Sequence, residues 1–161
     1  MKKTKLTCII MMIFYFISLW IYSPAFSSDK INWHKFKEGM ELGKKGQKKI
    51  FLYFYADWCE YCEDMEKITF KDQTVIDILN SSFIPVRVNA DKEKRAASGY
   101  NIRGLPSNWF ITENGENISN LPGYIPPDKL FFILKYIHTD SYKSMTFKSY
   151  LKNLIASEKQ Q

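Results

Sequence analysis

The chain has 161 residues, a formal net charge of +6, and 45% hydrophobic residues. This length and composition suit one domain with a substantial core. The positive charge comes with no basic stripe and no RNA-binding motif, so we do not expect a nucleic-acid partner. No internal repeat or low-complexity linker divides the chain, and we expect a single domain and a monomer.

The first 27 residues have the layout of a secretory signal. A lysine-rich start precedes a mostly apolar run over residues 6–22, and Ala25-Phe26-Ser27 offers small residues at the two positions that a signal peptidase recognises. The run is long for a cleaved signal and short for a membrane span, which needs about 20 residues. We predict export to the periplasm with cleavage near Ser27, which leaves a domain of residues 28–161. A retained N-terminal anchor is the alternative.

Helices and buried strands alternate in the first half of the predicted domain. Apolar residues at helical spacing predict a helix over residues 31–45, with Gly43 and Gly46 ending it. The apolar and aromatic run over residues 50–55 predicts a strand buried on both faces. The elements expected next are a helix, a second helix with Asp72 as its N-cap, a strand and a short helix, at residues 59–68, 72–79, 83–88 and 93–100.

A hairpin and two helices are predicted in the second half. Asn114-Gly115 is a strong hairpin signal between predicted strands at residues 108–112 and 117–120. Pro126-Pro127-Asp128 suits the start of a helix, and a last helix is expected from Ser144 to Ile155. The order of elements predicts an α/β fold: a mixed sheet with helices on both faces and an extra C-terminal helix.

Cys59 and Cys62 are the candidate reactive residues. Cys8 lies in the expected signal, so the exported domain would keep two cysteines three apart. A bridge between them closes almost no loop and stabilises little, which favours a chemical role. Both the unpaired N–H groups and the dipole at a helix N-terminus stabilise a thiolate. We assign Cys59 as the exposed nucleophile and Cys62, one turn into the helix and more buried, as the resolving thiol.

A zinc site and two unrelated structural cysteines are the alternatives for this pair. Zinc would need two further ligands, and the two histidines of the chain, His34 and His138, lie far apart in sequence. We therefore expect no metal and no cofactor.

Two motifs in the chain resemble the thioredoxin superfamily. They are the string from Phe54 to Cys59 followed by Cys62, and Gly104-Leu105-Pro106 farther along the chain. The resemblance spans residues 31–137 and implies the thioredoxin fold and disulfide exchange through the two cysteines.

Two branches of the superfamily are similar to different parts of the chain. The Tyr55-Ala56-Asp57-Trp58-Cys59 string, with Glu66 and Thr69-Phe70 after it, is especially similar to the C-terminal periplasmic domain of the DsbD proteins. The chain end, from Pro122-Gly123-Tyr124 onward, looks more like small periplasmic thioredoxins of the SoxW type.

The resemblance also implies a substrate-binding surface. Pro106 would be cis and lie beside the two sulfurs, the backbone of Leu105 would pair with a bound substrate strand, and Trp58 would flank the sulfurs. Without the resemblance, Pro106 would be taken as an ordinary turn proline, since X-Pro bonds are cis only about 5% of the time. Trp58 would be taken as a core aromatic.

Proton transfer is the point at which the chain departs from thioredoxin. Thioredoxin has a buried acid six residues before its first cysteine, where this chain has Tyr53. Proton transfer to and from Cys62 must then use another group, and Asp57 and Glu66 are the candidates. The alternative is that both are surface acids on a solvated helix face.

The direction of electron flow is inferred from charge. The segment from Asp57 to Glu66 carries five acids and no base before Lys67. These acids oppose the helix dipole and should keep the pKa of Cys59 closer to its free value, which favours a reductase of disulfides in exported proteins. A reductase in an oxidising compartment needs a membrane electron donor of the DsbD or CcdA type. A disulfide oxidase or isomerase, or a thioredoxin-fold binding or chaperone module, is the alternative.

Overall fold

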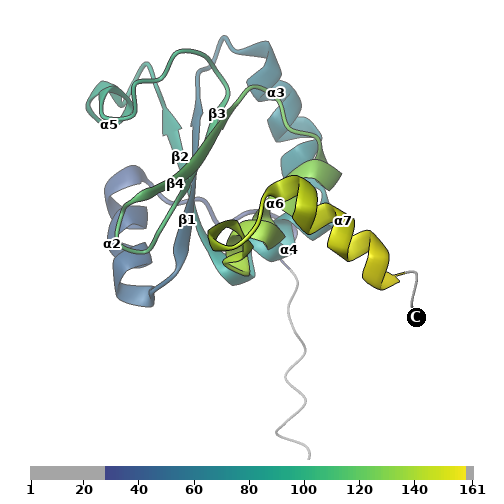
Figure 1. Cartoon of the computed structure of the whole chain (residues 1–161). Helices are drawn as coiled ribbons and strands as arrows, with labels where there is room; N and C mark the ends of the chain where they lie inside the picture. The colour runs from purple at the N-terminus through teal and green to yellow at the C-terminus, as the bar shows by residue number, and fades with distance from the viewer. Residues whose placement is uncertain (1–27, 159–161) are drawn as a thin grey trace, which may run out of the picture.

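Residues 28–158 are described by the computed structural model, and the expected signal lies outside this part (Figure 1). The strands are β1 Lys49–Tyr55, β2 Phe83–Asn89, β3 Ser107–Ile111 and β4 Asn117–Pro122. The helices are α2 Phe36–Gly46, α3 Glu60–Lys67, α4 Gln73–Ser82, α5 Lys94–Ser98, α6 Pro127–His138 and α7 Phe147–Glu158. Two 3-10 turns, η1 Thr69–Lys71 and η2 Ser141–Lys143, complete the set.

The sheet has four strands in the order β2-β1-β3-β4. β1 pairs in parallel with β2 and antiparallel with β3, and β3 pairs antiparallel with β4. The hairpin between β3 and β4 turns at Gly115, whose φ of 88° is the left-handed conformation that glycine adopts without strain. The predicted mixed sheet is confirmed.

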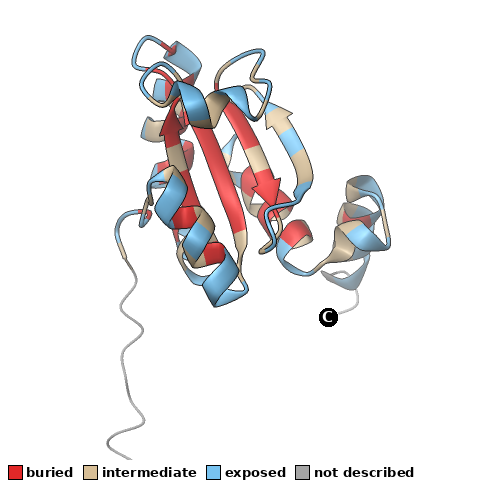
Figure 2. Ribbon diagram, turned by 90° about the vertical axis from the view of Figure 1, so that its left-hand side faces the viewer, coloured by how far each residue is buried: buried red, intermediate tan, exposed pale blue. Residues whose placement is uncertain are grey.

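β1 is the centre of the core. Its residues Ile50 to Phe54 are at most 1% exposed. Phe51 and Tyr53 pack on one face with α3, α4 and α6. Ile50, Leu52 and Phe54 pack on the other face with side chains from α2 and α5. Figure 2 shows this layering, with buried central strands and helices whose outer surfaces are exposed. Helices therefore cover both faces, as predicted.

The predicted helix over residues 31–45 is wrong at its start, since α2 begins at Phe36. The segment before it lies beside β2: the His34 N–H donates to Pro85 O at 2.9 Å, and the Arg87 N–H donates to His34 O at 3.2 Å. These sheet-like bonds use the backbone groups that a helix would need. Trp33 packs in the core from this extended segment, not from a helix.

Gly43 was expected to end α2, but it lies inside the helix, which continues to Gly46. A Cβ on Gly43 would lie 2.7 Å from Ile50 Cδ1, and one on Gly39 would lie 2.1 Å from Val86 Cγ2. Both glycines are buried against the sheet. They let the backbone of α2 approach β1 and β2 closely, so their role is packing.

Helices α3 to α6 begin within one residue of the predicted positions. Asp72 is the N-cap of α4 and accepts hydrogen bonds from the Thr74 and Val75 N–H groups. α6 has Pro127 in its first turn. α7 begins at Phe147, three residues later than expected, because Thr146 caps it: the Thr146 hydroxyl oxygen accepts from the Ser149 N–H at 3.2 Å. Within the described residues, no helix has the length and apolar character needed to cross a membrane.

Gly39→Ala should destabilise the fold by about 1–3 kcal/mol, because the added methyl group overlaps Val86 and the helix must move away from the sheet. Gly46→Ala is the control in the same helix, since its Cβ meets nothing closer than 4.0 Å. Urea unfolding of both variants measures the difference. Equal stabilities would contradict the proposed close approach of α2.

Candidate active site

Three segments meet at one end of the sheet. β1 ends at Tyr55, which pairs with Asn89 at the end of β2. Phe54 pairs with Ser107, the first residue of β3. The loops that follow β1 and β2 and the one that precedes β3 therefore lie together, and they carry the two cysteines, the residues after Asn89 and the Leu105-Pro106 pair.

Cys59 and Cys62 form a disulfide with an S–S distance of 2.08 Å. Cys59 is the N-cap of α3, and its sulfur accepts a hydrogen bond from the Cys62 N–H at 3.2 Å. The helix N-terminus thus supplies the N–H donor that stabilises charge on this sulfur. Cys62 is 2% exposed, and Cys59, expected to be exposed, is only 7% exposed in the oxidised form.

The peptide bond between Leu105 and Pro106 is cis, which confirms the conformation that the resemblance implied. The Gly123 N–H donates to Pro106 O at 2.7 Å and ties this loop to the segment after β4. Asn108, fully buried on β3, donates to the Leu121 and Gly123 carbonyl oxygens at 3.0 and 3.1 Å. These bonds fix the loop that precedes β3.

Trp58 lies on the surface beside the disulfide. It is 73% exposed, and its indole Nε1 donates to Asp91 Oδ2 at 2.8 Å. The carboxylate of Asp57 accepts from Asn89 Nδ2 at 2.9 Å and lies 2.7 Å from Lys92 Nζ. The loop after β2 therefore holds both residues that precede Cys59. An indole that is exposed yet held in place is available for contact with a protein ligand.

Tyr53 occupies the position of the thioredoxin acid and is fully buried. Its hydroxyl donates to the Cys62 carbonyl oxygen at 3.3 Å. Burial raises the pKa of the Tyr53 phenol, and the nearby Glu66 carboxylate raises it further. The phenol therefore stays protonated at neutral pH and positions the α3 backbone instead of exchanging a proton.

Glu66 is held by Arg87 from β2. The Glu66 Oε1 atom lies 2.6 Å from Arg87 Nη2, and the guanidinium carbon of Arg87 lies 4.3 Å from the centre of the Tyr55 ring. Both partners are about one-third exposed. Because Glu66 follows Cys62 by one helical turn, this ion pair lies on the Cys62 side of α3.

The acidic segment around the cysteines is therefore largely compensated. Asp57 pairs with Lys92 and Glu66 pairs with Arg87, and Glu63 pairs with Lys67 within α3. Within residues 28–158 no ion pair involves Glu60 or Asp64. Neighbouring residues in the sequence do not reveal Arg87 and Lys92, the two bases that β2 and its following loop bring to the site.

The described residues contain no cluster of three or more potential metal ligands of the His, Cys, Asp and Glu types. His34 Nδ1 lies 3.2 Å from Glu38 Oε1, and the His138 ring packs 6.2 Å from the ring of Phe83. Both histidines have contacts of their own, away from the sulfurs.

Fold and site together define the class of protein. A dithiol pair at the start of the helix after the central strand, with a cis proline before the neighbouring strand, is the arrangement of a thioredoxin-fold thiol:disulfide oxidoreductase. Within that class the chain belongs to the thioredoxin-like domain family, which matches residues 36–138.

The chain is related at a distance to the DsbD proteins. Thiol:disulfide interchange protein DsbD of Photorhabdus laumondii is 32% identical over 90 residues, which are 54% of this chain and 15% of DsbD. The oxidised C-terminal domain of Neisseria meningitidis DsbD is 25% identical with a TM-score of 0.51, over 62% of this chain and 90% of that domain. A thioredoxin from Thermus thermophilus shares the fold at 23% identity, with a TM-score of 0.61 over 67% and 87% of the two chains.

Arg87→Met should move the thiol titration of the reduced protein to higher pH by about 0.5–1 unit, because Glu66 then bears a charge without its cation. Glu66→Gln should move the titration to lower pH, and Arg87→Lys should leave it near the wild-type midpoint. The ultraviolet absorbance of the thiolate measures each midpoint.

Lys49→Met provides the matched control, since Lys49 pairs with Asp140 at the opposite end of β1. It removes one cation from an ion pair without approaching the sulfurs. If this variant shifts the titration as much as Arg87→Met does, the effect comes from net charge and not from the Glu66 pair.

Proposed function

We propose that this chain is an exported protein-disulfide reductase that acts through a cycle between the Cys59–Cys62 dithiol and its disulfide. The observation that carries the disulfide-exchange cycle is the position of Cys59, whose sulfur receives the Cys62 N–H at the N-terminus of α3. The proposed direction rests on the acidic neighbours of Cys59 and on the lack of a base in Glu60-Tyr61. The relationship to DsbD supports disulfide exchange with protein partners. Export rests on the layout of residues 1–27, which lies outside the described part.

The proposed reaction is two successive thiol–disulfide exchanges. The Cys59 thiolate attacks one sulfur of a substrate disulfide, forms a mixed disulfide and releases the other sulfur as a thiolate that takes a proton from water. Cys62 then loses its proton and attacks the Cys59 sulfur. The mixed disulfide breaks, the second substrate thiol leaves, and the chain keeps the disulfide seen here. Two electrons pass from the dithiol to the substrate.

The surrounding residues have supporting roles in this proposal. Trp58, held by Asp91, offers an exposed aromatic surface to the substrate beside Cys59. The backbone of Leu105, before the cis Pro106, would pair with an extended segment of the substrate. This mode of recognition accepts many sequences, because backbone hydrogen bonds carry it.

Glu66 is the better placed of the two proposed proton carriers. It lies one turn beyond Cys62 on α3, whereas Asp57 is bound by both Asn89 and Lys92 in front of Cys59. The ion pair with Arg87 holds the Glu66 carboxylate on the Cys62 side of α3. Asp57 would act mainly by its charge near Cys59.

A reductase in an oxidising compartment needs a continuing supply of electrons. The proposed donor is a membrane protein of the DsbD or CcdA type, which would reduce the Cys59–Cys62 disulfide by the reverse exchange. The proposed substrates are disulfide-bearing exported proteins. The Glu60-Tyr61 dipeptide contributes no base next to the thiols, which supports this direction.

One observation favours the opposite direction. The Cys62 N–H bond to the Cys59 sulfur and the ion pairs of Asp57 and Glu66 both help a thiolate, and a stabilised thiolate makes a stronger oxidant. A disulfide oxidase or isomerase is therefore the second candidate.

Cys59→Ser should abolish reduction of a protein disulfide such as that of insulin, because the attacking sulfur is gone. Cys62→Ser should instead accumulate mixed disulfides, since attack proceeds but resolution fails. Non-reducing electrophoresis and mass spectrometry detect the trapped species. Wild-type turnover by Cys62→Ser would refute the assigned roles, and full activity of the double serine variant would indicate a binding module whose thiols are incidental.

The reduction potential decides between reductase and oxidase. We expect a value below about −200 mV, nearer to thioredoxin than to the strong oxidants. Equilibration of the protein with glutathione buffers of known ratio, read by alkylation and mass, gives the potential directly. A potential near −120 mV would replace the reductase by the oxidase.

A further inference from the structure

The outer surface of α6 and α7 forms an apolar groove, with Lys129 and Asp128 as its charged lining residues. Its volume is about 510 Å³. The apolar side chains that line it are Pro126, Phe132, Phe147, Leu151, Leu154 and Ile155. Ile155 is 55% exposed, one of the few large hydrophobic residues in residues 28–158 with so much surface in water. α7 lies beyond the part of the chain that matches the thioredoxin-like family, so the groove is an addition to that fold.

The arrangement of α7 separates its buried face from this groove. Tyr150 is 8% exposed and packs against Tyr136 of α6, with ring centres 5.3 Å apart. Leu151 and Ile155 follow each other by one turn on the flank next to this buried face. Lys148 and Lys152 follow each other by one turn farther round the helix, and both are exposed. Apolar and cationic side chains therefore run in two parallel rows.

α6 continues the same pattern on its outer side. Phe131 and Phe132 are both half-buried, with ring centres 5.5 Å apart. Lys135 Nζ lies 5.3 Å from the centre of the Phe131 ring. Lys129 lines the groove itself, together with one acid, Asp128. Lys129 and Lys135 of α6 and Lys148 and Lys152 of α7 thus lie on the outer sides of the two helices, and Asp128 is the acid that lines the groove.

The N-terminal end of the described chain is bonded to α4. Ser28 O accepts a hydrogen bond from Gln73 of α4, and Asn80 of α4 donates to Lys30 O at 2.9 Å. α4 packs directly on α6. The start of the described chain is therefore linked to α6 through α4.

We propose that the α6–α7 face docks on the surface of an anionic lipid bilayer. We define this face by Phe132, Leu151, Leu154 and Ile155 together with Lys129, Lys135, Lys148 and Lys152. The aliphatic and aromatic side chains enter the boundary between headgroups and acyl chains, and the lysines contact lipid phosphates. Binding of this kind is reversible. It is compatible with cleavage of the N-terminal segment and with its retention as an anchor.

Charge complementarity favours a bilayer over a second copy of this chain. A symmetric contact through this face would place the four lysines against the same four lysines, and like charges held together oppose association. An anionic leaflet instead offers many phosphates to lysines that flank an apolar row. The pairing of aliphatic groups with long cationic side chains at their edge also suits the headgroup region, where lysine stems lie along the apolar surface.

The test is binding of the chain from Ser28 to vesicles. The two core clusters of the described part are built from residues 31 onward, so we expect the chain from Ser28 to fold. It should bind vesicles in which about a third of the lipid is phosphatidylglycerol, and bind poorly to phosphatidylcholine alone. Lys148→Glu with Lys152→Glu should weaken binding by at least about 25-fold, since each lost lysine is worth about fivefold and each new carboxylate is repelled by the anionic surface. Leu151→Ser with Ile155→Ser should weaken it as well.

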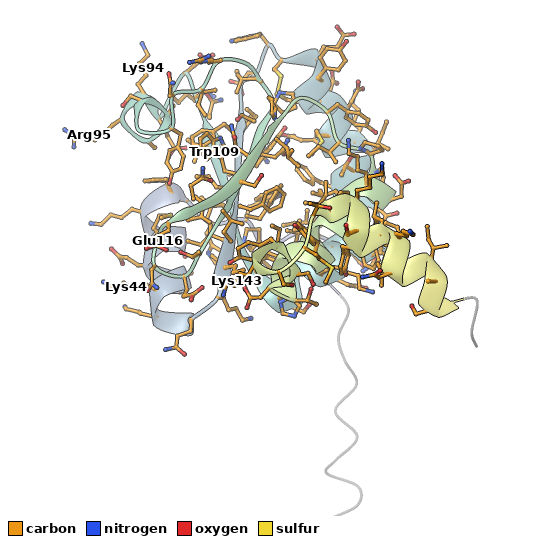
Figure 3. The ribbon with its side chains drawn as sticks, viewed as in Figure 1. Lys44, Lys94, Arg95, Trp109, Glu116 and Lys143 are labelled. Carbon is orange, nitrogen blue, oxygen red and sulfur yellow. A yellow bond between two sulfur atoms is a disulfide. The ribbon has the colours of Figure 1, made fainter. Side chains whose placement is uncertain are left out.

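Lys44→Glu with Lys45→Glu is the matched control. It makes the same change of charge on α2, where Lys44 lies on the opposite side of the molecule from α7 (Figure 3). These variants should bind within about twofold of wild type, because the lysines of α2 stay more than a Debye length, about 8 Å, from the bilayer surface. Disulfide exchange with a small disulfide should be unchanged in every variant, which shows that each is folded and separates this inference from the proposed function.

Three results would overturn the proposal. Equal losses for the α2 and α7 charge variants would show attraction by net charge alone. Unchanged binding of the serine variant would remove the apolar contact from the proposed face. Self-association of the wild type that the serine variant lacks, measured by sedimentation without lipid, would assign the face to a second copy of the chain.

Discussion

Burial of β1 on both faces is the constraint on which this structure depends. Its alternate side chains enter two separate clusters, so helices must cover both sides of the sheet. A strand buried in this way must also have both edges paired, and β2 and β3 supply those pairs. The chain that leaves β1 at Tyr55 can then emerge only at the end of the sheet. The position of the reactive cysteines at this end of the sheet is therefore set by β1, and not by the residues of the loop that carries them.

The same constraint explains the electrostatics of the site. β2 lies alongside β1 in parallel register, so the last residues of both strands reach the same edge. Arg87 and Lys92 thereby come to Glu66 and Asp57, although more than 20 residues separate the members of each pair in sequence. The neutral, buried Tyr53 phenol stands where thioredoxin has its acid. Charge near Cys62 is thus supplied from the helix and a neighbouring strand, outside the core.

The sequence predicted the parts of the fold that depend on local pattern. The apolar run of β1, the Asp72 cap, the Asn114-Gly115 turn and the proline start of α6 each have a short-range physical cause, and each is found in the structure. The two cysteines were recognisable for the same reason, because their spacing and the helix that follows can be seen within ten residues.

The features that the sequence did not predict depend on contacts between distant segments. Gly43 is a residue type that commonly ends helices. In the structure it instead lets the helix backbone approach Ile50 closely across the helix–sheet interface. Residues 31–35 have helical periodicity, but the backbone of His34 is bonded to β2. Arg87 could have been noticed as a charged residue within an apolar strand. Its partner could not have been identified without the register that sets β2 against β1.

The short loop between Cys59 and Cys62 links the redox chemistry of this chain to its folding thermodynamics in a simple way. A bridge across two intervening residues restricts the unfolded chain very little, and that restriction is fixed by the spacing alone. The thermodynamic cycle that joins folding and oxidation must close. The folded protein and an unstructured peptide of the same Cys-Glu-Tyr-Cys sequence can differ in reduction potential. That difference, converted to a free energy for two electrons, therefore equals the difference in unfolding free energy between the oxidised and reduced folds. Contacts such as the Cys62 N–H to the Cys59 sulfur set both quantities together, so a chemical denaturation experiment on the two redox forms is also an electrochemical measurement.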